Sequence, residues 1–207
     1  MTTGTWAGPV LVALGAFVVA PSYGADVRPA LKVSAEFGGD KLVAVGTTGS
    51  SSSDSLNAGE GLALGGGVSI LNDAKDIETE VVLSYKFFGI HADNGDIDFR
   101  VIPLDALVFY RIPHWRFGGG LTYHMNPKLK GSGDASGLEA EYKNALGFVL
   151  QTDYMFGTSQ KMKLGLRYTN VKYKASKIQD TSIIQVNSEP PSSANTNAVG
   201  LVFTVSF

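Results

Sequence analysis

Apolar and polar residues alternate with a period of two through most of this chain, and the alternation is strictest in the last nine residues, 199–207. Such alternation places one set of side chains on each face of a β-strand. In water, an apolar strand at a chain end favours aggregation, whereas in a bilayer it can close a barrel with its apolar face toward lipid. The large apolar residues of this strand are Val199, Leu201, Phe203, Val205 and Phe207.

Seven more segments alternate in the same way, and no long stretch has the 3.6-residue period of a helix. Three connections are short, near residues 72, 112 and 158, and four are long, near residues 50, 92, 132 and 185. Short and long connections therefore alternate along the chain, as in bacterial outer-membrane barrels. The seven segments lie near residues 30–37, 61–71, 77–87, 99–110, 115–124, 142–156 and 162–168.

The segment at residues 99–110 changes parity. Phe99 and Val101 share odd numbers, whereas the apolar residues from 104 to 110 share even numbers. A slip of one residue would move every side chain to the other face, and proline is tolerated at bulges. The pattern therefore predicts a bulge at Ile102 and Pro103, which would turn Arg100 and Asp105 to the same side.

These elements predict an all-β, eight-stranded, antiparallel, up-and-down transmembrane barrel with both termini in the periplasm. The strand directions place aromatic residues in two rows, as expected at the two membrane interfaces. A soluble sandwich or a lipocalin-like barrel is the alternative, but it would not need aromatic rows at both rims. The predicted periplasmic row is Tyr110, Trp115, Phe117, Tyr154, Phe156 and Phe207, and the outer row is Phe37, Tyr85, Phe87, Phe99, Tyr123, Tyr142 and Tyr168.

The first 24 residues read as a cleaved secretory signal peptide, with the barrel at residues 25–207 and an outer-membrane location. The apolar run at residues 10–20 has 11 residues, whereas a spanning helix needs about 20. Small residues, Ser22 and Gly24, precede the expected cleavage site. Residues 1–24 contain no Lys or Arg, unlike a usual signal peptide, and a structured N-terminal helix is the alternative.

The composition of the chain argues against several classes of function and site. The 207 residues carry a net charge of −2, so no basic excess indicates nucleic-acid binding. The chain has no cysteine, which excludes disulfides and thiolate metal sites. No cofactor is expected. An acidic run at residues 93–98 resembles part of a calcium loop but lacks the downstream glutamate, so we interpret it as a solvated hairpin tip.

Charged side chains on the predicted inner face balance, with seven cations and seven carboxylates. An eight-stranded barrel is filled by its own side chains, and buried charges must be paired. The sequence thus predicts an interior of ion pairs and not an open pore. The fourteen are Lys32, Lys86, Arg100, Arg116, Lys143, Lys163, Arg167, Glu36, Asp40, Glu78, Glu80, Asp105, Glu141 and Asp153. The ten assigned to the ion network are Glu36, Glu78, Glu80, Lys86, Arg100, Asp105, Arg116, Asp153, Lys163 and Arg167.

The sequence resembles the small eight-stranded outer-membrane barrels of the OmpA-transmembrane and OmpX type. The resemblance is carried by residues 38–40, 118–123, 164–168 and 199–207. It implies an envelope-stabilising or surface-interaction role without enzymatic activity, and a monomer. It also implies contact with outer-membrane lipid and lipopolysaccharide, and recognition of the terminal strand by the barrel assembly machinery.

Two other functions stay open at this stage. A lipid-modifying enzyme, resembling lipid A deacylases or palmitoyltransferases, would need a serine and a histidine in contact. Of His91, His114 and His124, only His124 is expected at a suitable depth, and no adjacent His-Ser pair occurs. A narrow channel of the OmpW type would require an apolar lumen. Basic residues that could contact lipopolysaccharide phosphates are Lys128, Lys130, Lys172, Lys174 and Lys177.

Overall fold

The computed structural model describes residues 25–46, 53–92, 95–180 and 190–207. The predicted signal peptide lies outside these ranges, as does part of the acidic run at residues 93–98. Among the described residues, no helix is both long enough and apolar enough to cross a membrane.

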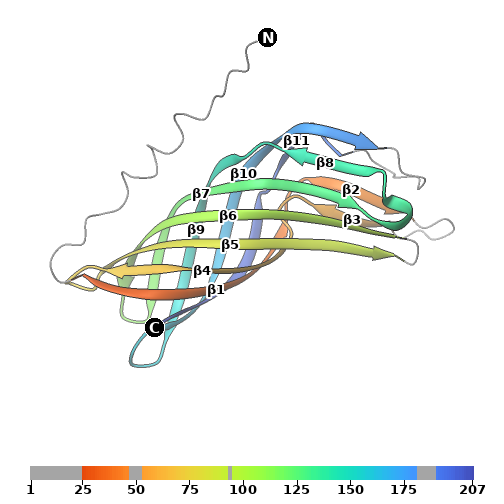
Figure 1. Cartoon of the computed structure of the whole chain (residues 1–207). Coiled ribbons are helices and arrows are strands. Elements are labelled where there is room, and N and C mark those ends of the chain that lie inside the picture. Colours follow the sequence, from red (N-terminus) through yellow and green to blue (C-terminus); the bar gives the residue numbers. More distant parts are fainter. Residues whose placement is uncertain (1–24, 47–52, 93–94, 181–189) are drawn as a thin grey trace, which may run out of the picture.

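Eight antiparallel strands of the described chain form a closed ring (Figure 1). Each pairs with its neighbour along the chain, and the last strand pairs with both the first and the one before it. The predicted eight-stranded antiparallel barrel is therefore confirmed. The ring consists of β1 (Asp26–Gly38), β4 (Gly61–Leu71), β5 (Ile77–Ala92), β6 (Gly95–Ile112), β7 (Trp115–Gly131), β9 (Ala145–Phe156), β10 (Met162–Asp180) and β12 (Ala198–Ser206).

One end of the barrel, here called the turn end, carries the three short connections. In the first, Asn72 Oδ1 accepts hydrogen bonds from the backbone N–H groups of Asp76 and Ile77, at 3.1 Å each. Asparagine commonly stabilises tight turns in this way. The C-terminus lies at the same end of the barrel (Figure 1).

The opposite end, here called the loop end, is more ordered than the sequence predicted. Residues 125–138 and 175–195 were expected to be loops, but β7 runs to Gly131 and β10 to Asp180. Further short elements lie here: β2 (Lys41–Gly46) pairs with β3 (Ser53–Asn57), β8 (Leu138–Tyr142) pairs with β7 and β10, and β11 (Ser193–Asn195) pairs with β10. A 3₁₀ turn, η2 (Gly133–Ala135), precedes β8.

The predicted bulge in β6 is wrong. Buried residues keep odd numbers along β6 from Ile97 to Arg111. The extra residue is in β7, because Arg100 pairs with Lys128 whereas Ile102 pairs with Met125. The backbone there turns through a positive φ of 50° at Asn126, a conformation that asparagine tolerates. The inner face of β6 is apolar at Phe99 and Val101 and charged at Asp105. This change of polarity along one face was interpreted as a one-residue change of register.

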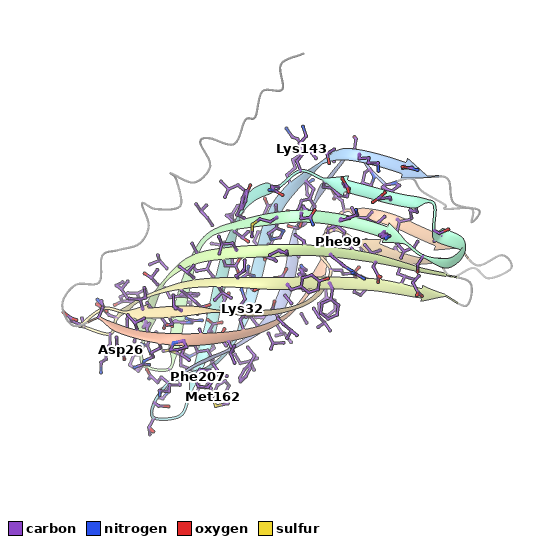
Figure 2. All side chains as sticks on the ribbon, viewed as in Figure 1. Asp26, Lys32, Phe99, Lys143, Met162 and Phe207 are labelled. Carbon is purple, nitrogen blue, oxygen red and sulfur yellow. The ribbon has the colours of Figure 1, made fainter. Side chains whose placement is uncertain are left out.

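The outer surface around the turn end and middle of the barrel is an apolar belt of exposed aliphatic and aromatic side chains. Phe207 and Met162 lie at its turn end (Figure 2). All six residues of the predicted turn-end aromatic row are exposed. In the loop-end row, Phe99 and Tyr142 are buried, so their assignment was wrong; both lie beyond the belt, where apolar side chains point into the barrel.

Candidate functional site: the charged interior

Buried charged side chains line the inner face of the barrel at two heights. Nine of the ten residues assigned to the ion network lie there, whereas Arg100 is on the outer surface beside Asp98, 3.2 Å away. Lys143 is also exposed, and Asp40 lies on the surface. Arg111, which the sequence placed in a turn, points inward. The sequence signal for this inward orientation is that Arg111 has an odd residue number, like the inward-facing Asp105 of the same strand.

The group nearer the turn end, the turn-end cluster, consists of Glu78, Glu80, Arg111, Arg116, Asp153 and Lys163. Arg116 is its centre and is fully buried. Its Nη1 lies 2.8 Å from Glu78 Oε1 and 2.9 Å from Glu80 Oε2. Its Nε lies 2.5 Å from Asp153 Oδ2. Because the arginine fork presents five donors in a fixed plane, one guanidinium can hold three carboxylates.

Other members complete this cluster around Glu78. Lys163 Nζ lies 2.5 Å from Glu78 Oε1, and Arg111 Nε lies 3.4 Å from Oε2. Ser69 donates a 2.6 Å hydrogen bond to the same carboxylate. The cluster thus contains three cations and three carboxylates among the described residues, so its charges balance.

Packing holds Arg116 and Asp153 in place. The guanidinium carbon of Arg116 lies 3.9 Å from the centre of the Phe109 ring, a cation–π contact. A Cβ atom at Gly165 would lie 1.9 Å from Asp153 Oδ1, so this glycine makes room for the carboxylate. Inward-facing glycines of this kind allow a narrow barrel to hold long charged side chains.

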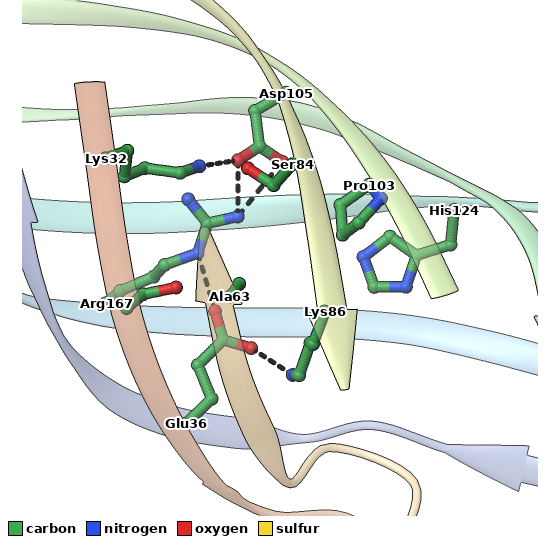
Figure 3. Close-up of a pocket in the computed structure, with 10 residues that line it drawn as sticks. Lys32, Glu36, Ala63, Ser84, Lys86, Pro103, Asp105, His124 and Arg167 are labelled. Carbon is green, nitrogen blue, oxygen red and sulfur yellow. Dashed lines mark hydrogen bonds and ion pairs between the residues drawn. The ribbon is translucent and has the colours of Figure 1, made fainter. Parts of the chain in front are cut away.

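The second group, the loop-side cluster, consists of Lys32, Glu36, Lys86, Asp105 and Arg167 (Figure 3). Asp105 contacts Lys32 Nζ and lies 3.0 Å from Arg167 Nη2. Glu36 lies 2.6 Å from Lys86 Nζ and 2.9 Å from Arg167 Nε. Arg167 therefore joins both carboxylates, and all five side chains are buried.

His124 lies between the loop-side cluster and the loop end. It is only 2% exposed, and its Nδ1 is hydrogen-bonded to the Tyr173 hydroxyl. The ring lines the small cavity beside Lys86 and Arg167 (Figure 3). His124 therefore points into the barrel and not to its outer surface.

An apolar cluster closes the interior above His124. Its members come from the loop-end halves of the long strands, from β8 and β11, and from the β2–β3 hairpin. They are Leu42, Val43, Leu56, Ala58, Ile97, Phe99, Val101, Leu129, Ala135, Leu138, Ala140, Tyr142, Ala145, Val171, Tyr173 and Ala194. The interior therefore changes along the barrel from charged to apolar.

At the loop end, an ion-pair ladder runs across the outer surface of β7, β8 and β10. Lys128 Nζ lies 2.7 Å from Glu139 and 2.8 Å from Glu141, and Lys177 lies 3.3 Å from Glu139. Hydrogen bonds to Glu139 and Glu141 raise the pKa of Lys128 above its ordinary value, and hydrogen bonds from Lys128 and Lys177 lower the pKa of Glu139. Within the described ranges, no group of acidic and histidine side chains is arranged to hold a metal ion.

A closed ring of eight strands with an apolar outer belt is the architecture of the small outer-membrane β-barrel proteins. No protein-family model matches the chain, and no curated protein matches it.

Among solved structures, the chain is similar to Neisserial surface protein A (NspA), with 13% identity, a TM-score of 0.46, and coverage of 89% of this chain and 99% of that one. It is also similar to Ail, the attachment invasion locus protein of Yersinia pestis, solved in complex with the heparin analogue sucrose octasulfate. That match has 10% identity, a TM-score of 0.49, and coverage of 87% and 96%.

Proposed function

We propose that this protein is an integral outer-membrane barrel with a sealed interior, and that it acts through its surface and not through catalysis or transport. The observation that carries this proposal is the inversion of polarity: the belt exposes aliphatic side chains while charged side chains are buried inside. Such a surface is stable in lipid and is an aggregation hazard in water. Its expected role is to stabilise the envelope or to present the loop end to outside partners.

The lengths of the connections support a proposed orientation in the membrane. Short connections lie at the periplasmic side of outer-membrane barrels, so the turn end and both ends of the mature barrel would face the periplasm. The loop end, with exposed Lys130, Lys172 and Lys174, would then lie at the outer leaflet. Lipopolysaccharide phosphates are the partners that these lysines would meet, and the barrel would function as a monomer.

We expect the protein to show no steady conductance in planar bilayers. Two charged clusters and the apolar cluster lie along the interior, and we expect them to leave ions no continuous path. Single-channel recording after reconstitution measures this, and a general porin added later to the same bilayer serves as the positive control. Reproducible openings before the porin is added would contradict the sealed interior and favour a channel.

We expect Phe207→Ala to reduce the amount of folded protein in the outer membrane, with little effect on the stability of the purified barrel. The Phe207 side chain is 59% exposed, so the fold gains little from it, whereas the assembly machinery would recognise it. Folded protein is measured by the heat-dependent gel mobility of outer-membrane fractions.

Phe156→Ala is the matched control, because Phe156 is another exposed aromatic residue of the turn-end row. It should leave the outer-membrane level unchanged. Equal losses for the two variants would show that the terminal residue has no special role in assembly.

A further inference from the structure

The two charged clusters differ in their charge balance. Among the described residues, the turn-end cluster has three cations and three carboxylates, whereas the loop-side cluster has three cations and only two carboxylates. The three cations are Lys32, Lys86 and Arg167, all at most 3% exposed. A buried charge lowers stability unless an opposite charge is paired with it.

Hydrogen-bond donors also outnumber acceptors in the loop-side cluster. Each lysine ammonium has three N–H donors. Lys86 uses two of them, on Glu36 and on the Gly59 carbonyl, both at 2.6 Å. Within the described ranges, Lys32 uses one, on Asp105. Of the six lysine donors, three therefore have no acceptor within hydrogen-bond distance in the described part of the chain, and both carboxylates are already shared between two cations.

A small cavity lies beside these donors. It has a volume of about 10 Å³ and is lined by all three cations, by His124 and by Ser84. The Ser84 hydroxyl is buried and has no hydrogen-bond partner in the described part of the chain. Figure 3 shows Ser84 beside Asp105, on the same side of the cavity as Lys32. A space of this size holds about one water-sized particle.

We propose that this cavity binds one small monovalent anion, of which chloride is the physiological example. The anion would accept hydrogen bonds from a free donor of Lys32 and from the Ser84 hydroxyl, and it would balance the third positive charge. A water molecule would satisfy the donors but leave the charge uncompensated. Polyatomic anions such as sulfate or gluconate are too large for the cavity.

Chloride dependence of folding tests this site. The purified full-length barrel is unfolded with urea in detergent micelles, while sodium chloride is replaced by sodium gluconate at constant ionic strength. Because only the folded state holds the anion, the ratio of folded to unfolded protein should rise with chloride concentration, approaching a slope of about one on logarithmic axes. A ratio that is independent of chloride would overturn the proposal.

Two variants test whether the chloride dependence of folding arises at this cavity. Lys32→Met leaves two cations against two carboxylates, so it should abolish the chloride dependence. Lys163→Met removes a buried lysine from the balanced turn-end cluster and should keep the full dependence, although the barrel is less stable. Retained dependence in Lys32→Met would overturn the assignment to this cavity.

Crystals grown in sodium bromide give a readout that does not require either variant to fold. An anomalous peak between Lys32 and Ser84 is the expected result. Full occupancy of the cavity by water, with no anomalous signal, would refute the proposal.

Discussion

Replacing Arg116 with methionine is expected to lower the free energy of unfolding by about 3–5 kcal/mol, the usual cost of removing one partner from a buried ion pair. The guanidinium holds Glu78, Glu80 and Asp153 at 2.5–2.9 Å. Methionine has a similar volume, so the loss reflects mainly three carboxylates left with too few cations. Urea unfolding in detergent micelles measures the difference.

Arg100→Met is the matched control for this prediction. Arg100 is on the outer surface and has one ion pair, at 3.2 Å to Asp98, so its loss should change stability by less than about 0.5 kcal/mol. Adding Glu80→Gln and Asp153→Asn to Arg116→Met should recover part of the lost stability, because the uncompensated charges are removed. Equal effects of Arg100→Met and Arg116→Met would contradict the central role of Arg116.

Replacing Leu83 with arginine is expected to destabilise the barrel in lipid vesicles by about 2–4 kcal/mol, the cost of placing a cation on the lipid face near the bilayer midplane. Leu83 is 50% exposed on the outer face of β5, roughly midway between Ile77 at the turn end and Phe87 toward the loop end. Folding equilibria in vesicles of outer-membrane lipid composition measure this change.

Ile178→Arg tests whether that cost comes from lipid. Ile178 is 40% exposed, comparable to Leu83, but it lies on the part of β10 that pairs with β8 beyond the apolar belt. There the substitution should change stability by less than about 0.5 kcal/mol. A soluble barrel would tolerate arginine at both positions, so two neutral results would contradict the membrane location.

The apolar belt could be predicted from the sequence because strand alternation is local. Ile77 to Phe87 shows this: every odd residue was assigned to the outer face and every even residue to the interior. The structure has Glu78, Glu80, Ser84 and Lys86 buried and Leu83, Tyr85 and Phe87 exposed. A period of two decides the faces of a strand without knowledge of its partners.

Toward the loop end, the assignment of apolar side chains to the outer face was wrong, and the reason is physical. In the belt, apolar side chains face outward, whereas beyond it they face inward and the barrel has an ordinary apolar core. Phe99 and Tyr142 were placed in the outer aromatic row because their polarity was interpreted as lipid-facing, and both are buried. Along β6 the odd-numbered residues from Ile97 to Arg111 stay buried. What changes along the strand is whether the apolar side chains or the polar ones face outward.

The sequence by itself determined the strand pattern, the outward faces of the belt and most of the charged side chains that point inward, because each depends on neighbours one or two residues apart. Only the tertiary structure decided which charges meet. It joined Arg116 to carboxylates 36, 37 and 38 residues away. It also turned Arg100 outward and Arg111 inward, which leaves the number of inner cations unchanged. It placed Lys143, Asp40 and Glu141 outside the interior, so that six cations face five carboxylates among the described buried residues. Contacts between distant strands depend on barrel register and closure, which no local period contains.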